Sequence, residues 1–132
     1  MKEILDTRFF VELFFSMDPR VLDRVREKLR DVRRRREGVL PTLVLAEFFD
    51  QACRRAGTRE ASNAWDALLA SGLEIHPLTP AIARAAGGLR CRHRGVPMAD
   101  CVVAATAAEL RARVITDDPH FRDLHGIRVA WM

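Results

Sequence analysis

Long hydrophobic runs are absent from the 132-residue sequence. No apolar segment approaches the ~18 residues that a membrane-spanning helix requires, so we expect no membrane association. The first ten residues, MKEILDTRFF, include an acidic residue where a signal peptide would be apolar. This start argues against an export signal and favours a cytoplasmic protein.

Cysteine is scarce as well. The chain has only Cys53, Cys91 and Cys101, an odd number, and no two of them have CxxC spacing. The pattern suggests neither a disulfide framework nor a zinc site, and it fits a reducing compartment. Cys101 has no base at motif spacing, which favours a small core residue over a nucleophile.

Lysine is nearly missing from the cationic residues. Only Lys2 and Lys28 are lysine among the 22 Lys and Arg residues, so arginine dominates the formal net charge of +4. Arginine forms bidentate contacts with phosphate, which permits a nucleic-acid partner. A GC-rich coding bias produces the same composition, so the charge alone is weak support for nucleic-acid binding.

The overall balance is that of a globular protein, with 48% hydrophobic and 30% charged residues. No internal repeat, low-complexity tract or long linker interrupts the chain, so we expect a single domain over residues 1–132. A chain of this length buries roughly two thirds of the surface that its unfolded form exposes, which is enough for one core.

Short apolar segments alternate with segments of helical periodicity. The predicted strands are residues 3–6, 38–41, 73–76, 113–116 and 127–131. The predicted helices are residues 7–15, 18 to about 37, 42–56, 58 to about 71, 79–94 and 98–112. This alternation implies right-handed crossovers, so we expect a three-layer α/β/α domain with a mostly parallel central sheet. Ligands bind in such folds beyond the carboxyl ends of the strands.

Several acidic residues fall at these strand ends or in the helices that follow. Asp6 ends the first predicted strand, and alone it is best explained as a helix cap. Asp100 lies in the first turn of a predicted helix, where the helix dipole favours a negative charge by about 0.5 kcal/mol. Asp118 precedes Pro119, a pair that is typical of a helix start.

Glu47 differs from these residues because it lies between apolar neighbours in the segment LVLAEFF. A buried carboxylate without a partner is costly, so its side chain either reaches a partner or stays partly hydrated. Arg54, two turns further along the predicted helix, and Arg8 are the candidates for an ion pair.

Together, the acids Asp6, Glu47, Asp100 and the adjacent Asp117 and Asp118 converge on one edge of the predicted sheet. Carboxylates gathered in this way repel one another and raise their pKa values. A hard divalent cation, Mg²⁺ or Mn²⁺, offsets the repulsion, since it prefers oxygen ligands. Such an ion orients a phosphate and lowers the pKa of a bound water. We therefore expect a metal site, with either Asp117 or Asp118 as both a helix cap and a ligand.

Four segments resemble the PIN-domain ribonucleases, of the VapC toxin type found in bacterial and archaeal toxin–antitoxin pairs. They are LDT at 5–7, TLVLAEF at 42–48, ADCVVAATAAEL at 99–110 and VITDDPHF at 114–121. The resemblance covers nearly the whole chain, and the last two segments with their mutual spacing are the most specific. It implies a Mg²⁺- or Mn²⁺-dependent endoribonuclease that hydrolyses RNA phosphodiester bonds with a quartet of acids.

The resemblance assigns the quartet to Asp6, Glu47, Asp100 and one residue of the Asp117-Asp118 pair. Asp118 is favoured because the family commonly places this acid two residues after a threonine and three before a phenylalanine. Asp6 and Asp100 then become the main metal ligands. Asp118, with Asp117 as the alternative, and Glu47 complete the site, partly through water.

Thr7 and Thr116 match the hydroxyl positions that support the acids or a metal-bound water in the family. Arg8 departs from the pattern, because an Asn or Ser often stands at this position. It can pair with a site acid, contact a substrate phosphate or point to solvent. The resemblance further implies an RNA substrate, a VapB-like antitoxin that inserts a basic residue into the acidic site, and a homodimer.

Two arginine-rich segments are further candidates for RNA contacts. The run RRRRE at 33–37 is also explained by the preference of cations for a helix C-terminus. Arg90, Arg92 and Arg94 precede the loop that leads to Asp100, and we expect them to contact phosphate if this loop borders the site. His120 and His125 have no partner cysteine, and we expect no metal role for them.

Two alternatives to the toxin nuclease stay open. In the first alternative, the chain is a PIN-like module that binds RNA or protein with little catalysis. Arg8 and the ambiguous Asp117-Asp118 pair motivate this alternative. In the second, the chain is a housekeeping RNA-processing or DNA-directed nuclease rather than a toxin.

Overall fold

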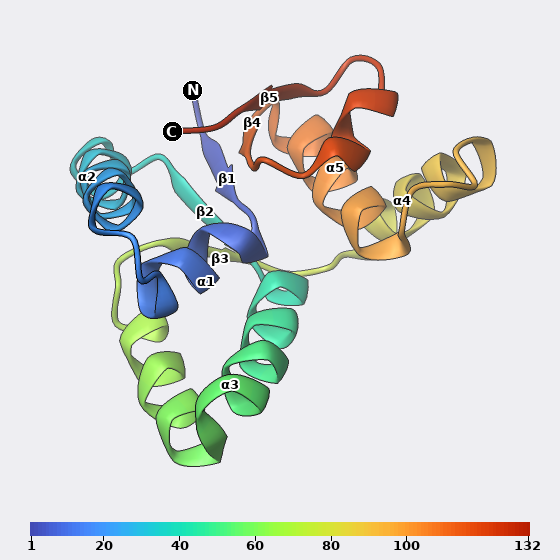
Figure 1. Cartoon of the computed structure of the whole chain (residues 1–132). Coiled ribbons are helices and arrows are strands. Elements are labelled where there is room, and N and C mark those ends of the chain that lie inside the picture. Colours follow the sequence, from blue (N-terminus) through green and yellow to red (C-terminus); the bar gives the residue numbers. More distant parts are fainter.

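Five short parallel strands form one central sheet in the computed structural model, which describes all residues from 1 to 132 (Figure 1). The strand order is β3-β2-β1-β4-β5, and all four pairings are parallel. Ile4 in the central strand lies opposite Val39 on one side and Val114 on the other. The strands are β1 (Glu3–Leu5), β2 (Gly38–Pro41), β3 (Glu74–His76), β4 (Arg113–Ile115) and β5 (Arg128–Ala130).

The chain moves outward from β1 in one direction to β2 and β3, and then returns past β1 to β4 and β5. Because crossovers between parallel strands are right-handed, reversing the direction puts the later helices on the other face of the sheet. The helices α1, α2 and α3 therefore cover one face, and α4 packs against α5 on the other (Figure 1). This confirms the expected three-layer α/β/α fold.

The helices begin and end close to the predicted positions. Asp18 accepts a hydrogen bond from the backbone N–H of Arg20 at 2.9 Å, and Pro19 occupies the first helical position of α2. Gly57, with φ of 87°, interrupts α3 where the sequence predicts a break between two helices. The helices are α1 (Thr7–Phe15), α2 (Pro19–Arg35), α3 (Thr42–Leu69), α4 (Pro80–Arg92), α5 (Met98–Leu110) and the 3-10 helix η1 (Pro119–Asp123).

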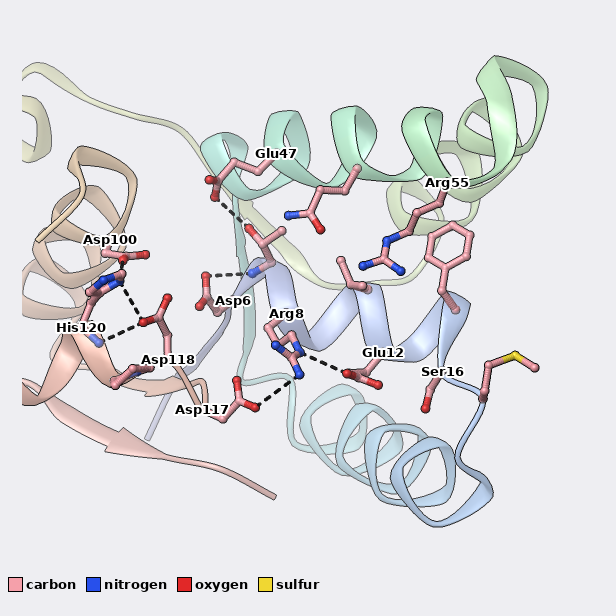
Figure 2. A pocket seen from close by; sticks show the side chains of 16 residues that line it. Asp6, Arg8, Glu12, Ser16, Glu47, Arg55, Asp100, Asp117, Asp118 and His120 are labelled. Atoms are coloured by element: carbon pink, nitrogen blue, oxygen red, sulfur yellow. Dashed lines mark hydrogen bonds and ion pairs between the residues drawn. The ribbon is translucent and has the colours of Figure 1, made fainter.

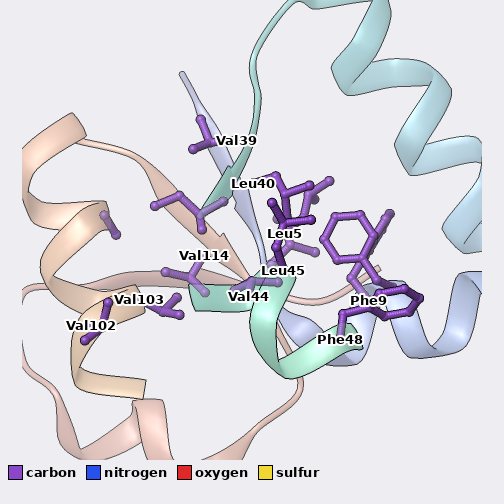
Figure 3. Packing of buried hydrophobic residues seen from close by; sticks show 14 of the residues in the cluster. Leu5, Phe9, Val39, Leu40, Val44, Leu45, Phe48, Val102, Val103 and Val114 are labelled. Atoms are coloured by element: carbon purple, nitrogen blue, oxygen red, sulfur yellow. The ribbon is translucent and has the colours of Figure 1, made fainter. Parts of the chain in front are cut away.

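The core fills the space between the sheet and both helix layers (Figure 3). On the first face, Phe9 of α1 and Phe48 of α3 are fully buried. On the second face, Val103 of α5 is buried with the alanines around it, whose small side chains let the helix approach the strands closely. Cys101 is buried there too, which confirms it as a small core residue. No helix combines the length and the apolar character that crossing a bilayer requires.

The carboxyl ends of the strands carry the polar residues. Asp6 directly follows β1, Thr116 directly follows β4, and α3 starts immediately after β2. Parallel pairing brings these three points to one edge of the sheet. Residues far apart in the sequence thus meet where α/β folds bind their ligands.

Candidate active site

Asp6 lies at the centre of this edge and is almost fully buried. Its Oδ1 accepts a hydrogen bond from the backbone N–H of Thr7 at 2.8 Å, which caps α1, and its Oδ2 accepts one from the Thr116 hydroxyl at 2.8 Å. Burial raises the pKa of Asp6 above its ordinary value, and the nearby charges of Glu47 and Asp118 raise it further. The two hydrogen bonds offset only part of this effect. Asp6 is therefore both a helix cap and a carboxylate without a cationic partner.

Glu47 lies in the second turn of α3 and faces the same space (Figure 2). Its Oε1 accepts a hydrogen bond from the Thr7 hydroxyl at 2.8 Å. The expected ion pairs with Arg54 or Arg8 are not formed, because Arg54 contacts Asp50 at 2.6 Å and Arg8 points elsewhere. Since its partner is a neutral hydroxyl, the charge of Glu47 is not compensated.

Asp100, in the first turn of α5, approaches from the other face of the sheet. Burial raises its pKa to about 6, and the charges of Asp118 and Asp6 add to the shift. His120 opposes it, with its Nδ1 3.0 Å from Asp100 Oδ2. The acids in this group therefore destabilise one another's charged forms, as the sequence predicts for carboxylates that converge.

Asp118 and Asp117 point to different partners, so the structure separates the adjacent pair. Asp118 caps η1 by accepting a hydrogen bond from the His120 backbone N–H at 2.9 Å, and its Oδ1 lies 3.0 Å from His120 Nδ1. Asp117 is more exposed and lies 3.8 Å from the guanidinium of Arg8. Arg8 also contacts Glu12 at 3.0 Å. Asp118 is thus the member of the pair that joins Asp100.

The sequence led us to expect no metal role for His120, but its imidazole lies beside Asp100 and Asp118. One ligand atom each from Asp100, Asp118 and His120 lie within 4.8 Å of one another, close enough to hold one metal ion. The sequence signal for this role is the position of His120 in the first turn of a helix that Asp118 caps. Its spacing from a cysteine or from His125 carries no such signal. Carboxylate oxygens with one imidazole suit Mn²⁺, and the oxygens alone suit Mg²⁺.

A cleft of about 720 Å³ contains all of these groups, and we call it the acidic cleft (Figure 2). Its lining includes the five carboxylates Asp6, Glu47, Asp100, Asp117 and Asp118. It then continues between α1 and α3 to a second end with different chemistry, where Phe15, Met17, Gln51 and Arg55 line it.

The arginines predicted to contact phosphate near Asp100 do not line the acidic cleft. Arg92 lines a separate hollow together with Arg84 and His125. A contact between RNA and Arg90, Arg92 or Arg94 stays a prediction that this geometry does not favour, because the cleft itself contains Arg8 and Arg55 instead.

Comparisons with known proteins agree with the architecture. The PIN domain family matches residues 4–127. The fold is similar to VapBC from Salmonella typhimurium bound to DNA, with a TM-score of 0.83 and 18% identity over 99% of this chain and 98% of that chain. VapBC2 from Rickettsia felis bound to promoter DNA gives a TM-score of 0.82 and 18% identity, with the same coverage. VapC20 from Mycobacterium tuberculosis, a toxin that cleaves the sarcin–ricin loop, gives 0.79 and 19% identity over 94% and 95% of the two chains. No curated protein matches the sequence.

Proposed function

The chain belongs to the PIN domain family, and from this premise we propose that it is a metal-dependent endoribonuclease and the toxin of a toxin–antitoxin pair. One observation carries the proposal. Asp6, Glu47, Asp100 and Asp118 face one cleft at the carboxyl edge of the sheet, and the imidazole of His120 is their sole basic partner. Nuclease chemistry explains why a protein keeps this costly arrangement, since a divalent cation held by the acids would also offset the negative charge of a phosphodiester.

In this proposal Asp6, Asp100 and Asp118 hold Mg²⁺ or Mn²⁺, and His120 adds a nitrogen ligand. A bound ion would offset the charge of the acids and of the phosphate, and it would supply a nucleophile by lowering the pKa of a bound water. The hydroxyls of Thr7 and Thr116 fix the carboxylates of Glu47 and Asp6 through hydrogen bonds of 2.8 Å.

Glu47 takes the role of the general base. Its carboxylate faces the cleft, accepts a hydrogen bond from the Thr7 hydroxyl and has no cation paired with it. Such a group accepts the proton of the attacking water, provided that it lies within hydrogen-bond reach of it. The other carboxylates are committed to holding the ion, so Glu47 is the acid that stays available.

The partners follow from the similar structures. Several of these are complexes of a VapC toxin with its VapB antitoxin, which supports a VapB-like partner for this chain. The VapC20 toxin cleaves the sarcin–ricin loop, which supports an RNA substrate. We extend the proposal to a single domain over residues 1–132 that acts as a homodimer in the cytoplasm.

The alternative of a binding module without catalysis is motivated by Arg8 and by the adjacent Asp117 and Asp118, and the contacts of these residues do not favour it. Arg8 pairs with Glu12 and Asp117, both outside the quartet, so it leaves the four acids available for a metal ion.

The other alternative is a housekeeping nuclease. Growth arrest on expression, relieved by an antitoxin encoded beside this chain, separates a toxin from a housekeeping nuclease.

The test incubates the purified chain with a synthetic single-stranded RNA in Mn²⁺, Mg²⁺ or EDTA. Asp100→Asn removes a proposed ligand and Asp50→Asn removes an exposed acid of α3 that pairs only with Arg54. We expect discrete cleavage that needs the metal, falls more than about 100-fold in Asp100→Asn, and persists in Asp50→Asn. Cleavage that survives EDTA, or that Asp100→Asn retains, contradicts the proposal.

A further inference from the structure

The two ends of the acidic cleft carry opposite charge. The acidic end is formed by the carboxylates at the sheet edge, and the other end contains the guanidinium of Arg55 (Figure 2). Glu47, Gln51 and Arg55 lie four residues apart in turn on α3, so they follow one face of the helix. At 1.5 Å per residue, Arg55 lies about 12 Å along the helix axis from Glu47. The cleft is therefore a short track with a negative end and a positive end.

Arg55 differs from the other arginines around it because it has no acidic partner. Arg8 is held by Glu12 and Asp117, and Arg54 is held by Asp50. Arg55 forms no ion pair, and its guanidinium lies over the ring of Phe15, 5.8 Å from the centroid. A guanidinium within about 6 Å of a ring centroid is attracted to the face of the ring, and the N–H groups of Arg55 stay available because no acid pairs with them. Phe15 of α1 thus gives Arg55 a contact from a second element that lines the cleft.

The surroundings of Arg55 offer the other contacts that a nucleotide makes. Gln51, one turn earlier on α3, offers amide donors and an acceptor to the same cleft. Met17, in the segment between α1 and α2, is 95% exposed and adds an apolar side chain to the lining of the same cleft. Successive bases of single-stranded RNA stack on aromatic side chains, and arginine binds the phosphates between them.

We propose that Arg55, which contacts Phe15, binds a backbone phosphate of the RNA a few nucleotides away from the bond that is cut. The inference rests on the proposed nuclease function, and it adds the direction of the strand: from the acids, outward between α1 and α3. A stacked strand rises about 3.4 Å per nucleotide, so about 12 Å corresponds to three or four nucleotides. The planar, permanently charged guanidinium matches a phosphate, which it binds through two hydrogen bonds.

An acidic peptide is the competing occupant, and the cleft favours RNA. A peptide that reached Arg55 with one carboxylate would need no contact with the acids at the other end. An RNA strand uses both ends, since its scissile phosphate belongs at the metal site and its neighbouring phosphates extend along the track. The apolar side chains of Phe15 and Met17, which line the same cleft as Arg55, also suit a base better than an acidic side chain.

The test measures binding of a fluorescein-labelled single-stranded oligoribonucleotide to the full chain by anisotropy, in Mn²⁺ at several salt concentrations. All proteins carry Asp100→Asn, so that the RNA stays intact, and Arg55→Ala and Arg54→Ala form a matched pair of adjacent, exposed arginines. We expect Arg55→Ala to weaken binding about 5- to 10-fold and to lower the salt slope by about 0.7, the value for one lost phosphate contact. Arg54→Ala leaves both quantities unchanged.

Neutral methylphosphonate linkages, introduced one at a time along the oligoribonucleotide, locate the contact. The proposal expects one linkage, three or four nucleotides from the cleavage site, that weakens binding in the protein with Arg55 and not in Arg55→Ala. An unchanged affinity and salt slope in Arg55→Ala overturns the proposal, and so does an equal loss in Arg54→Ala. The proposal is also overturned if Arg55→Ala weakens the binding of an acidic peptide and leaves RNA binding unchanged.

These outcomes are distinct from failure of the nuclease proposal. Cleavage by the chain without Asp100→Asn, with a KM that Arg55→Ala does not change, overturns the phosphate subsite and leaves the nuclease. RNA binding that depends on Arg55 without any cleavage in metal overturns the nuclease and supports the subsite.

Discussion

The central strand carries a buried carboxylate at each end, and the two have opposite environments. Glu3, at the start of β1, is completely buried and accepts hydrogen bonds from Lys28 at 3.0 Å, from Arg35 at 3.0 Å and from Arg113. Asp6, directly after the same strand, is nearly as buried but has only the Thr7 N–H and the Thr116 hydroxyl as partners. The same chemical group is therefore compensated by cations at one edge of the sheet and has only uncharged hydrogen-bond donors at the other.

The pKa values follow this difference. Burial alone would raise the pKa of Glu3, but the hydrogen bonds and charges of Lys28 and Arg113 outweigh it, and the pKa lies below its usual value. Burial raises the pKa of Asp6, and neighbouring acids add to the shift. Burial alone thus does not identify a functional carboxylate. A functional carboxylate is identified by the absence of a cationic partner in a chain that is rich in arginine.

The acids around the start of β1 also explain part of the arginine-rich run at 33–37. Arg35 contacts Glu3 at 3.0 Å and Asp31 at 2.7 Å, and it also pairs with Glu37. Arg34 contacts Asp31 at 3.0 Å. Arg35 therefore compensates the buried acid at the amino edge of the sheet and is structural, whereas Arg34 pairs with Asp31 on the exposed surface of α2.

Removing the compensated carboxylate has the largest expected effect. Glu3→Gln leaves Lys28, Arg35 and Arg113 without their shared partner, and we expect a loss of about 3 kcal/mol in the free energy of unfolding. Asp100→Asn removes a charge from the crowded edge, so we expect its stability without metal to equal or exceed that of the original chain. Urea unfolding of both variants measures the contrast, and an equal loss in the two contradicts it.

The two edges also differ in the direction of their pH dependence. The raised pKa of Asp100, about 6 against 3.8, means that the folded state holds its proton more tightly than the unfolded state. Its contribution therefore destabilises the metal-free protein as the pH rises from 4 to 7, by on the order of 2 kcal/mol. Glu3 acts in the opposite sense: its contribution is present above pH 4.5 and is lost as the pH falls through its lowered pKa.

Thermal unfolding between pH 4 and 7 in EDTA checks this dependence. We expect Asp100→Asn to flatten the decline in stability toward pH 7, while Asp50→Asn leaves the profile unchanged. If the stability of Asp100→Asn and that of the original chain decline in parallel over this pH range, the acidic edge is not the source of the decline.

His120 has the smallest expected effect. We expect His120→Asn to weaken Mn²⁺ binding about 10-fold, since the imidazole contacts both Asp100 and Asp118. Binding of Mg²⁺, which prefers oxygen ligands, should change less. His125→Asn, outside the acidic cleft, is the matched control, and an equal effect of both variants on Mn²⁺ binding removes His120 from the site.

The fold was largely predictable because its signals are local. Asp18 with Pro19 marks a helix start, and Gly57 marks the break in α3, each within a few residues of the sequence. The convergence of the acids was predictable from the expected parallel sheet, because the carboxyl ends of parallel strands lie at one edge. The partners of the acids were not, since the contact between Thr7 and Glu47 joins positions 40 residues apart. The choice between Asp117 and Asp118 depends on the direction of each side chain after β4, which no spacing encodes.

The most direct test of the central claim is calorimetric titration of Mn²⁺ into the metal-free protein. If uncompensated acids at the carboxyl edge form a metal site, the original chain and Asp50→Asn bind Mn²⁺ with equal affinity, and Asp100→Asn binds it at least about 10-fold more weakly. If the folded chain binds no Mn²⁺, or if Asp100→Asn binds it as well as the original chain does, the acidic edge is not a metal site.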